Sequence, residues 1–193
     1  MTPTITDLEQ NLRAGFRYFN RFMLLLWRLG LGSWFQFWPE FTGQILVITH
    51  IGRKTGLRRQ TPANFTIING QVYCAAGFGA HSDWYQNILQ NPNVEVWMPG
   101  GWWSGTAEDI SDHADRTEIM RRVLIGSGFA AYLFGINPKL PDGELERITK
   151  KYKLIRIDRT QAQTGKGGPG DLAWIWPLLT FLLIPLAFRR RKK

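Results

Sequence analysis

The stretch QILVITHIGRKTGLRRQTPANFTIINGQVYCAA, residues 44–76, determines most of the fold. Residues 44–50 are rich in β-branched side chains and predict a strand, and residues 59–69 predict a second strand. Asn69 and Gly70 form a dipeptide typical of two-residue hairpin turns, so residues 72–76 should pair with the second strand. Pro62 places part of the second strand at an edge or a bulge, because proline has no N–H for the ladder.

The sequence after this stretch adds more strands and a few helices. Residues 94–98 and 102–110 predict a second hairpin around Pro99 and two glycines, and residues 153–158 predict a last strand. Helices are expected over residues 81–90, with Ser82 as the N-cap, over 111–125 and over 141–150. Six strands with few helices predict an α+β fold built on a small antiparallel barrel, rather than a doubly wound sheet.

Charge and cysteine content exclude several functions. The 193 residues carry a net charge of +9, and residues 172–193 contribute five of those nine charges. The basic character therefore largely belongs to a tail, and nucleic acid is not the expected partner. The single cysteine, Cys74, excludes an internal disulfide and is expected to be an inert buried thiol. His50, His81 and His113 lack metal-ligand spacing, so we expect surface or loop histidines and no metal site.

The two ends of the chain differ from the middle in composition. We divide it into an amphipathic helical segment (1–43), a barrel domain (44–160), a glycine-rich linker (161–171) and an apolar tail with a basic end (172–193). The N-terminal helix suits a membrane surface or, equally, packing on the barrel. Residues 172–188 lack charges and precede RRRKK, which predicts association with membrane lipids at the cytoplasmic face. The tail could cross the membrane as a transmembrane helix or lie on it.

Residues 49–62 contain the strongest candidate for a binding site. Gly52 and Gly56 let backbone N–H groups turn toward a ligand, and Thr55 adds a hydroxyl donor. The cations of this loop, which bind phosphate or carboxylate groups well, are Arg53, Lys54, Arg58 and Arg59. The spacing is not that of a P-loop, so the pattern indicates an oxyanion site without nucleotide hydrolysis. A solvated basic hairpin loop is the alternative interpretation.

A second segment follows the strand that ends near residue 76. The small residues of AAGFGA, residues 75–80, leave space for a flat ring against the backbone. Trp84, Tyr85 and Asn87 begin the next helix and could face the same space. Aromatic residues in a short helix also commonly fill a core, which is the alternative for this segment.

Together, GRKTG at 52–56, Thr61-Pro62 and WYQNILQNPNV at 84–94 resemble the deazaflavin (F420)-dependent nitroreductase family of split β-barrel oxidoreductases. The resemblance covers about residues 44–110. It implies coenzyme F420 as the cofactor and two-electron hydride transfer as the reaction. By the same resemblance, the phosphate and glutamate tail would be held by Arg53, Lys54, Thr55 and Arg59. The ring and linker would be lined by Pro62, Ala76, Gly77, Phe78, Trp84 and Asn87.

Two positions depart from the family pattern. Asn64 stands where well-studied members have a substrate-pocket tyrosine, and Gly77 stands where they have a serine. Tyr132 is the tyrosine of residues 112–140 that could provide a hydroxyl on the substrate side, so we assign Asn64 and Tyr132 as the catalytic candidates.

The sequence therefore predicts a reductase that passes a hydride from reduced F420 to a small lipophilic acceptor, such as a quinone or a nitro compound. Two alternatives remain open. One is an FMN-dependent reductase on the same fold, because FMN also combines a phosphate with a planar ring. The other is a non-catalytic split barrel that holds a cofactor, a lipid or a tetrapyrrole. A homodimer is compatible with each of them.

Overall fold

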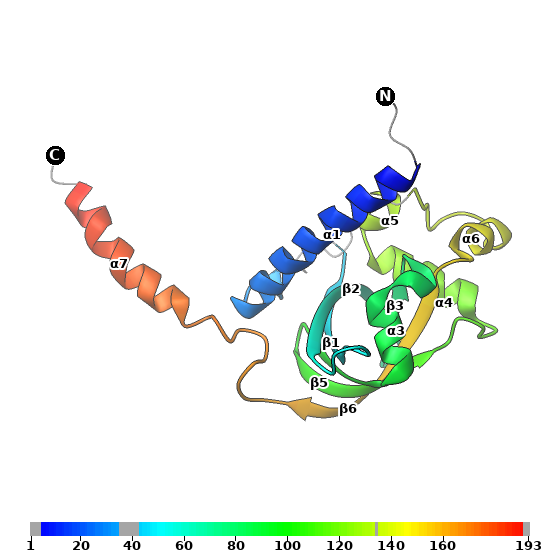
Figure 1. Ribbon diagram of the computed structural model, residues 1–193. Helices are drawn as coiled ribbons and strands as arrows, with labels where there is room; N and C mark the ends of the chain where they lie inside the picture. The colour runs from blue at the N-terminus through cyan, green and yellow to red at the C-terminus, as the bar shows by residue number, and fades with distance from the viewer. Residues whose placement is uncertain (1–4, 35–42, 134, 191–193) are drawn as a thin grey trace.

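The computed structural model describes residues 5–34, 43–133 and 135–190. Within them, the chain forms a closed antiparallel barrel in the order β1-β2-β3-β6-β5-β4 (Figure 1). The strands are β1 (Ile45–Ile51), β2 (Arg58–Ile68), β3 (Gln71–Ala76), β4 (Asn93–Met98), β5 (Gly101–Asp109) and β6 (Lys153–Gln163). This confirms the predicted α+β fold with a small split barrel and flanking helices.

One part of the barrel wall is incompletely paired. The β1–β2 register runs from Ile45↔Asn64 to Ile51↔Arg58, so β1 pairs along its whole length with the first part of β2, residues 58–64. The β2–β3 register begins only at Phe65↔Cys74. Residues 58–64 and the end of β3 with its following loop, residues 75–78, therefore border a gap in the pairing that we call the open seam. Pro62 lies in this unpaired edge, as its missing N–H predicts.

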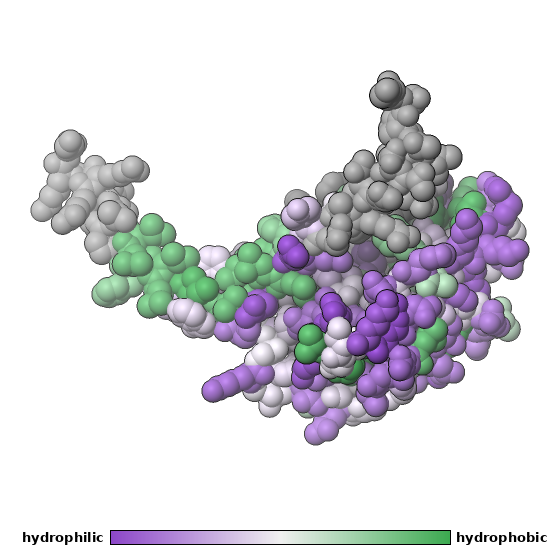
Figure 2. All heavy atoms as spheres, viewed as in Figure 1, coloured by the Kyte–Doolittle hydropathy of each residue, from purple (hydrophilic) through white to green (hydrophobic). Residues whose placement is uncertain are grey.

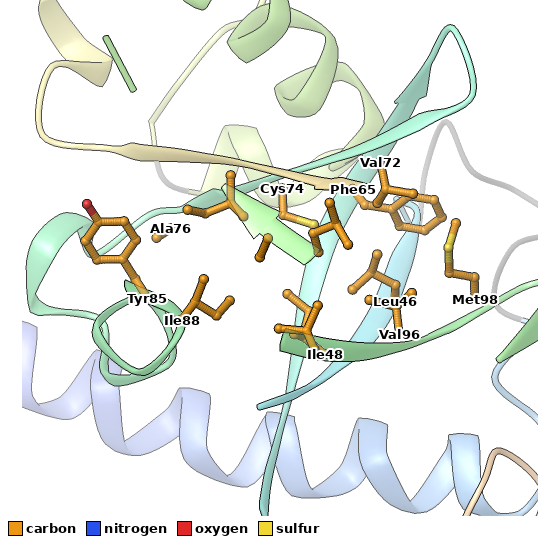
Figure 3. Packing of buried hydrophobic residues seen from close by; sticks show 14 residues of the cluster. Leu46, Ile48, Phe65, Val72, Cys74, Ala76, Tyr85, Ile88, Val96 and Met98 are labelled. Atoms are coloured by element: carbon orange, nitrogen blue, oxygen red, sulfur yellow. The ribbon is translucent and has the colours of Figure 1, made fainter. Parts of the chain in front are cut away.

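The barrel interior is filled by apolar side chains that alternate along the strands. Leu46, Ile48, Phe65, Val72 and Cys74 are among the residues that pack there (Figure 3). Cys74 is fully buried, and burial raises the pKa of its thiol, which confirms an inert buried cysteine. The interior is therefore a packed core, and a ligand must bind at the ends or on the outside of the barrel.

Helical segments within the described residues cover the barrel on several sides. The 3-10 turn η2 (Gly79–His81) and α3 (Asp83–Gln90) follow β3, and Tyr85 and Ile88 of α3 pack into the core at that end. The segments α4 (Arg116–Gly126), α5 (Phe129–Leu133) and α6 (Asp142–Thr149) follow β5. Buried residues of all three join Tyr73 and Leu154 on the outer side of β3 and β6.

The N-terminal helix α1 (Ile5–Arg28) packs on the other side of the barrel. Trp27 forms a buried cluster with Val47 of β1 and Trp97 of β4, and Met23 and Leu26 are also buried. Of the two alternatives for this helix, packing on the barrel is therefore correct for the last turns of α1. Tyr18, Phe22 and other apolar residues on a different side of α1 are exposed, so this helix has two apolar surfaces.

The C-terminal helix α7 (Ile175–Arg190) extends away from the barrel (Figure 1). It has 16 residues, about 24 Å at the usual rise, whereas the hydrocarbon part of a bilayer is about 30 Å thick. Over the described residues, no helix combines the length and the apolar character needed to cross a membrane. The predicted transmembrane helix is therefore not supported, and Arg191, Lys192 and Lys193 of the basic end lie outside the described residues.

Candidate functional site

The β1–β2 loop, residues 52–57, is the centre of the candidate site. The N–H of Gly52 donates to the carbonyl of Leu57 at 2.8 Å, and the N–H of Gly56 donates to the carbonyl of Gly52 at 2.8 Å. Gly56 has a φ of 67°, which favours glycine. A Cβ on Gly52 would lie 2.8 Å from Nε of Arg59 and 3.0 Å from Oγ1 of Thr55. Gly52 thus lets the side chains of Thr55 and Arg59 approach the loop backbone closely.

Helix α3 fixes one cation of this loop. The backbone N–H of Arg53 donates to Oδ1 of Asn87 at 3.0 Å, and the Arg53 guanidinium donates to the same oxygen at 3.1 Å. The guanidinium also forms an ion pair with Asp83 at 3.0 Å. Arg53 is half-buried, whereas Lys54, Thr55 and Arg59 are exposed. The loop and the start of β2 therefore have one anchored cation, Arg53, and three exposed ones, Lys54, Arg58 and Arg59. Of these, Arg58 pairs with Glu95 at 2.7 Å.

A buried histidine supports this anchor from inside the barrel. Because Oδ1 of Asn87 accepts from Arg53, the Asn87 amide nitrogen donates to Nδ1 of His50 at 3.1 Å. His50 Nε2 then carries the hydrogen and donates to Oγ1 of Thr61 at 3.2 Å. Burial, and secondly the charge of Arg59, lower the pKa of His50 from 6.5 to about 4, so the imidazole is neutral at pH 7.

The expectation of a surface or loop histidine is wrong for His50, which is 2% exposed. His50 follows Leu46 and Ile48 at a spacing of two, so strand alternation places it on the inner side. That spacing was a signal in the sequence for a buried histidine. Since an uncharged imidazole can accept from Asn87 and donate to Thr61, the inner position is satisfied without a buried charge.

A second buried network attaches α3 to the barrel. The Tyr85 hydroxyl donates to Oδ2 of Asp109 at 2.5 Å, and Oδ1 of Asp109 accepts from the backbone and the hydroxyl of Ser111. These donors outweigh desolvation and lower the pKa of Asp109, while burial and the Asp109 carboxylate raise the pKa of Tyr85. Glu108 instead pairs with Arg156 at 2.5 Å. Asp109 is therefore a structural carboxylate whose oxygens are occupied by donors.

Small residues border the open seam beside the loop. Ala76 is buried at the end of β3, Gly77 is exposed, and Phe78 is half-buried. A Cβ on Gly77 would meet the Tyr152 ring only at 3.8 Å, so this position has room beside it. Trp84 is half-buried against the barrel core. The structure thus brings the loop cations, Trp84 and Asn87 of α3 and the end of β3 to one end of the barrel.

The two catalytic candidates lie elsewhere. Phe65 points into the barrel, so alternation places Asn64 and Pro62 on the outer side of β2. The Asn64 amide donates weakly to the carbonyl of Gln44 at 3.4 Å. Tyr132 lies on α5 with 55% of its surface exposed. Across the part of the chain that the structure describes, no hydrogen bond joins these two side chains to each other or to the loop.

Elsewhere the described part of the molecule has a surface hollow of note. A hollow of about 340 Å³ is lined by Asn69, Gly70, Gln71, Trp103, Asp158 and Arg159, at the barrel end opposite the loop, and it includes none of the predicted site residues. In the described ranges 5–34, 43–133 and 135–190, no group of three histidine, cysteine or acidic residues could hold a metal ion. The exposed cations around the β1–β2 loop can bind an anionic group.

Comparison with known proteins gives one family and several solved structures. A family model described as F420H(2)-dependent quinone reductase matches residues 34–141, more than half of the chain. The structure is similar to an F420-H2 dependent reductase, FDR-A, at 21% identity over 60% of this chain and 94% of that one, with a TM-score of 0.46. It is also similar to a conserved hypothetical protein from Mycobacterium tuberculosis, at 17% identity over 66% of this chain and 86% of that one, with a TM-score of 0.46. A third similar structure is a putative pyridoxamine 5′-phosphate oxidase from Listeria innocua, at 13% identity over 62% of this chain and 86% of that one, with a TM-score of 0.43.

Proposed function

Since the chain belongs to the F420H(2)-dependent quinone reductase family, we propose that it transfers a hydride from reduced F420 to a lipophilic acceptor, a quinone or a nitro compound. It is an oxidoreductase, and its cofactor is coenzyme F420, as the resemblance of residues 44–110 implied.

The observation that carries the proposal is the donor set of the β1–β2 loop. Lys54, Thr55 and Arg59 are exposed at one barrel end and would bind the anionic tail of the coenzyme through charge-assisted hydrogen bonds. Arg53 adds a cation whose backbone is already fixed by Asn87. Because Arg53 is held before the ligand arrives, less ordering entropy opposes its contact with the ligand. The residues present therefore fit an elongated anionic cofactor.

The ring of the coenzyme would lie along the open seam. Pro62 lies on one border, and Ala76, Gly77 and Phe78 lie on the other, close to Trp84. The room beside Gly77 suits a flat ring. Bound reduced F420 supplies the hydride, and the chain's task is then to hold the ring edge toward the acceptor. We revise the role of Asn87 from lining the ring to holding Arg53, since its amide oxygen and nitrogen already have partners.

Asn64 and Tyr132 remain the candidates on the acceptor side. Asn64 shares the outer side of β2 with Pro62 and could donate an amide hydrogen to an acceptor oxygen. Tyr132 offers an exposed hydroxyl. The exposed apolar residues of α1, Tyr18 and Phe22 among them, support an acceptor of lipophilic character.

Titration followed by turnover tests the proposal. Oxidised F420 and FMN are added separately to the purified chain while tryptophan fluorescence is recorded. The reduced coenzyme is then mixed with a naphthoquinone or with a nitroaromatic. We expect F420 to bind in the micromolar range and its reduced form to be reoxidised by the quinone. Binding of FMN but not F420 would favour a flavin enzyme. Binding of F420 without turnover of either acceptor would favour a non-catalytic binding protein.

A charge reversal tests the placement of the anionic tail. Lys54→Glu should weaken F420 binding ten- to a hundredfold, because a well-placed ionic contact contributes about 1.5–3 kcal/mol. The matched control is Lys139→Glu, which reverses an exposed lysine that precedes α6. Equal affinities of the two variants would show that the tail binds elsewhere.

A further inference from the structure

Helix α7 has apolar side chains in every direction around its axis. At about 100° per residue, six of them divide the circumference nearly evenly. These six are Trp176, Leu178, Leu179, Phe181, Leu182 and Ile184, and each is 41% to 79% exposed. Figure 2 shows hydrophobic residues along α7 that continue to the point where α7 meets the rest of the molecule. A helix that is apolar all round belongs in an apolar surrounding rather than in water.

The start of α7 is fastened to the end of α1. Arg28 holds Asp171 with a forked contact, Nε to Oδ1 at 3.0 Å and Nη2 to Oδ2 at 2.9 Å. The N–H of Leu172 donates to the carbonyl of Arg28 at 2.8 Å, and the Trp176 indole N–H donates to the carbonyl of Leu29 at 2.8 Å. We call these contacts the α1–α7 clamp. These contacts fix the start of α7 against the end of α1.

Helix α1 carries an exposed apolar stripe of its own. Tyr18, Phe22 and Leu25 recur at helical spacing and are exposed, while Met23 and Trp27 face the barrel. Arg21, also exposed, lies beside the stripe. An apolar stripe flanked by basic residues is typical of helices that lie in a membrane interface.

We infer that α7 and the exposed stripe of α1 together form one docking surface for anionic lipid. Lipid is favoured over a second copy of the chain because a neighbouring protein covers one side of a helix, whereas acyl chains surround it. In the sequence, the apolar run is followed by five consecutive cations, residues 189–193, whose charge complements anionic headgroups. Trp174 and Trp176 at its start suit the same interface. Because the clamp links the two helices, binding of one helix to the lipid surface raises the effective concentration of the other helix there.

Vesicle flotation with the full chain tests this inference. The vesicles are phosphatidylcholine with or without phosphatidylglycerol. We expect flotation, stronger with phosphatidylglycerol. Leu182→Gln should lower the partition coefficient about tenfold, because one large apolar side chain no longer leaves water. The matched control Ile125→Gln changes a similarly exposed residue, 59% against 64%, on α4 and should leave the partition coefficient unchanged. Equal flotation of all three proteins would overturn the inference.

The contribution of the clamp and the rival partner are tested separately. Asp171→Asn removes the carboxylate that pairs with Arg28 and so weakens the clamp, while both apolar surfaces remain. Flotation should therefore weaken several-fold. Unchanged flotation of this variant would overturn the cooperation of the two helices. Sedimentation without lipid tests the rival. A dimer of the wild type that Leu182→Gln dissociates would assign α7 to a second copy and overturn lipid docking. F420 titration of each variant is independent, because no substituted residue lies at the β1–β2 loop.

Discussion

Arg53 contacts its anchor and a competing carboxylate at the same time. Asn87 fixes its backbone, while Asp83, with a side chain 86% exposed, pairs with its guanidinium at 3.0 Å. An anionic ligand at the β1–β2 loop would meet this carboxylate as a nearby like charge. Asp83 therefore lowers the affinity of the site for anions although it belongs to the same network.

Replacing Asp83 should accordingly strengthen binding. Asp83→Asn is expected to tighten F420 binding about two- to fivefold, since exposed charge pairs contribute about 0.2–1 kcal/mol. The effect should shrink as salt is added. Titration of Asp142→Asn provides the control, because Asp142 forms a similarly exposed pair with Arg121 on α4 and α6, away from the loop. Weaker binding by Asp83→Asn would mean that the carboxylate helps to arrange the site.

His50 links the site to the stability of the barrel. Its pKa is about 4 in the folded protein and about 6.5 when unfolded, so between these values the unfolded chain binds the extra proton. The free energy of unfolding should therefore fall as the pH falls from 6.5 to 4, by about 3 kcal/mol at most. His50→Gln should flatten this part of the pH profile in urea unfolding. His113→Gln, at an exposed histidine, should keep the wild-type slope, and a wild-type slope in His50→Gln would contradict the assignment.

At the scale of residues, the sequence predicted the site in part. Glycines and clustered arginines singled out the loop cations, and the family resemblance singled out Asn87. The structure places Asn87 against Arg53, and the roles of these residues toward the coenzyme stay predictions. The network through His50 and Thr61 was missed, because it joins two strands and one helix and depends on the register His50↔Arg59. Asn64 and Tyr132 were chosen by resemblance, and the structure leaves them apart from the loop.

Helix α3 is the element that closes the loop end of the barrel, and two of its contacts attach it there. Asn87 reaches the β1–β2 loop, and Tyr85 reaches Asp109 at the end of β5. Tyr85→Phe would leave one oxygen of a partly buried carboxylate without its donor. We expect a loss of about 1–2 kcal/mol, seen as a melting temperature lower by about 2–8 °C.

Tyr73→Phe is the matched control for this element. Tyr73 is also buried, but its hydroxyl donates to the uncharged amide of Gln71 at 2.8 Å. Because hydrogen bonds to charged groups are the stronger ones, the loss should be smaller. Equal losses in a thermal melt would contradict the structural role assigned to the Asp109 carboxylate.

Element boundaries were predicted well where turn chemistry is local. The Asn69-Gly70 turn has φ values of 52° and 81°, as a two-residue hairpin requires. The helix expected from Ser111 begins only at Arg116, because Ser111 instead donates to Asp109 and accepts from the N–H of Leu154. Strand β6 continues to Gln163 rather than 158, since pairing with β5 extends beyond its apolar residues. These differences arise from contacts between distant segments.

At the scale of the whole molecule, the clamp determines where the barrel domain ends. The glycine-rich segment expected to be a simple linker contacts α1, since the N–H of Gly170 donates to the carbonyl of Trp27 at 2.9 Å. Asp171 and Trp176 add the contacts described above. These contacts join residues 170–176 to α1, and the rest of α7 extends away from the barrel (Figure 1).

Two truncations distinguish this boundary. Removing residues 177–193 should leave the melting temperature and F420 affinity unchanged and greatly weaken flotation with anionic vesicles, because it takes away most of the exposed apolar helix but keeps the clamp and the exposed stripe of α1. Removing residues 171–193 also deletes Asp171, which raises the pKa of Arg28, and the indole of Trp176. That chain should melt about 2–4 °C lower, in line with about 1 kcal/mol for a partly exposed ion pair. If the shorter deletion already lowered the melting temperature or F420 affinity, α7 would be part of the folded core, and its apolar residues would need a protein partner rather than lipid.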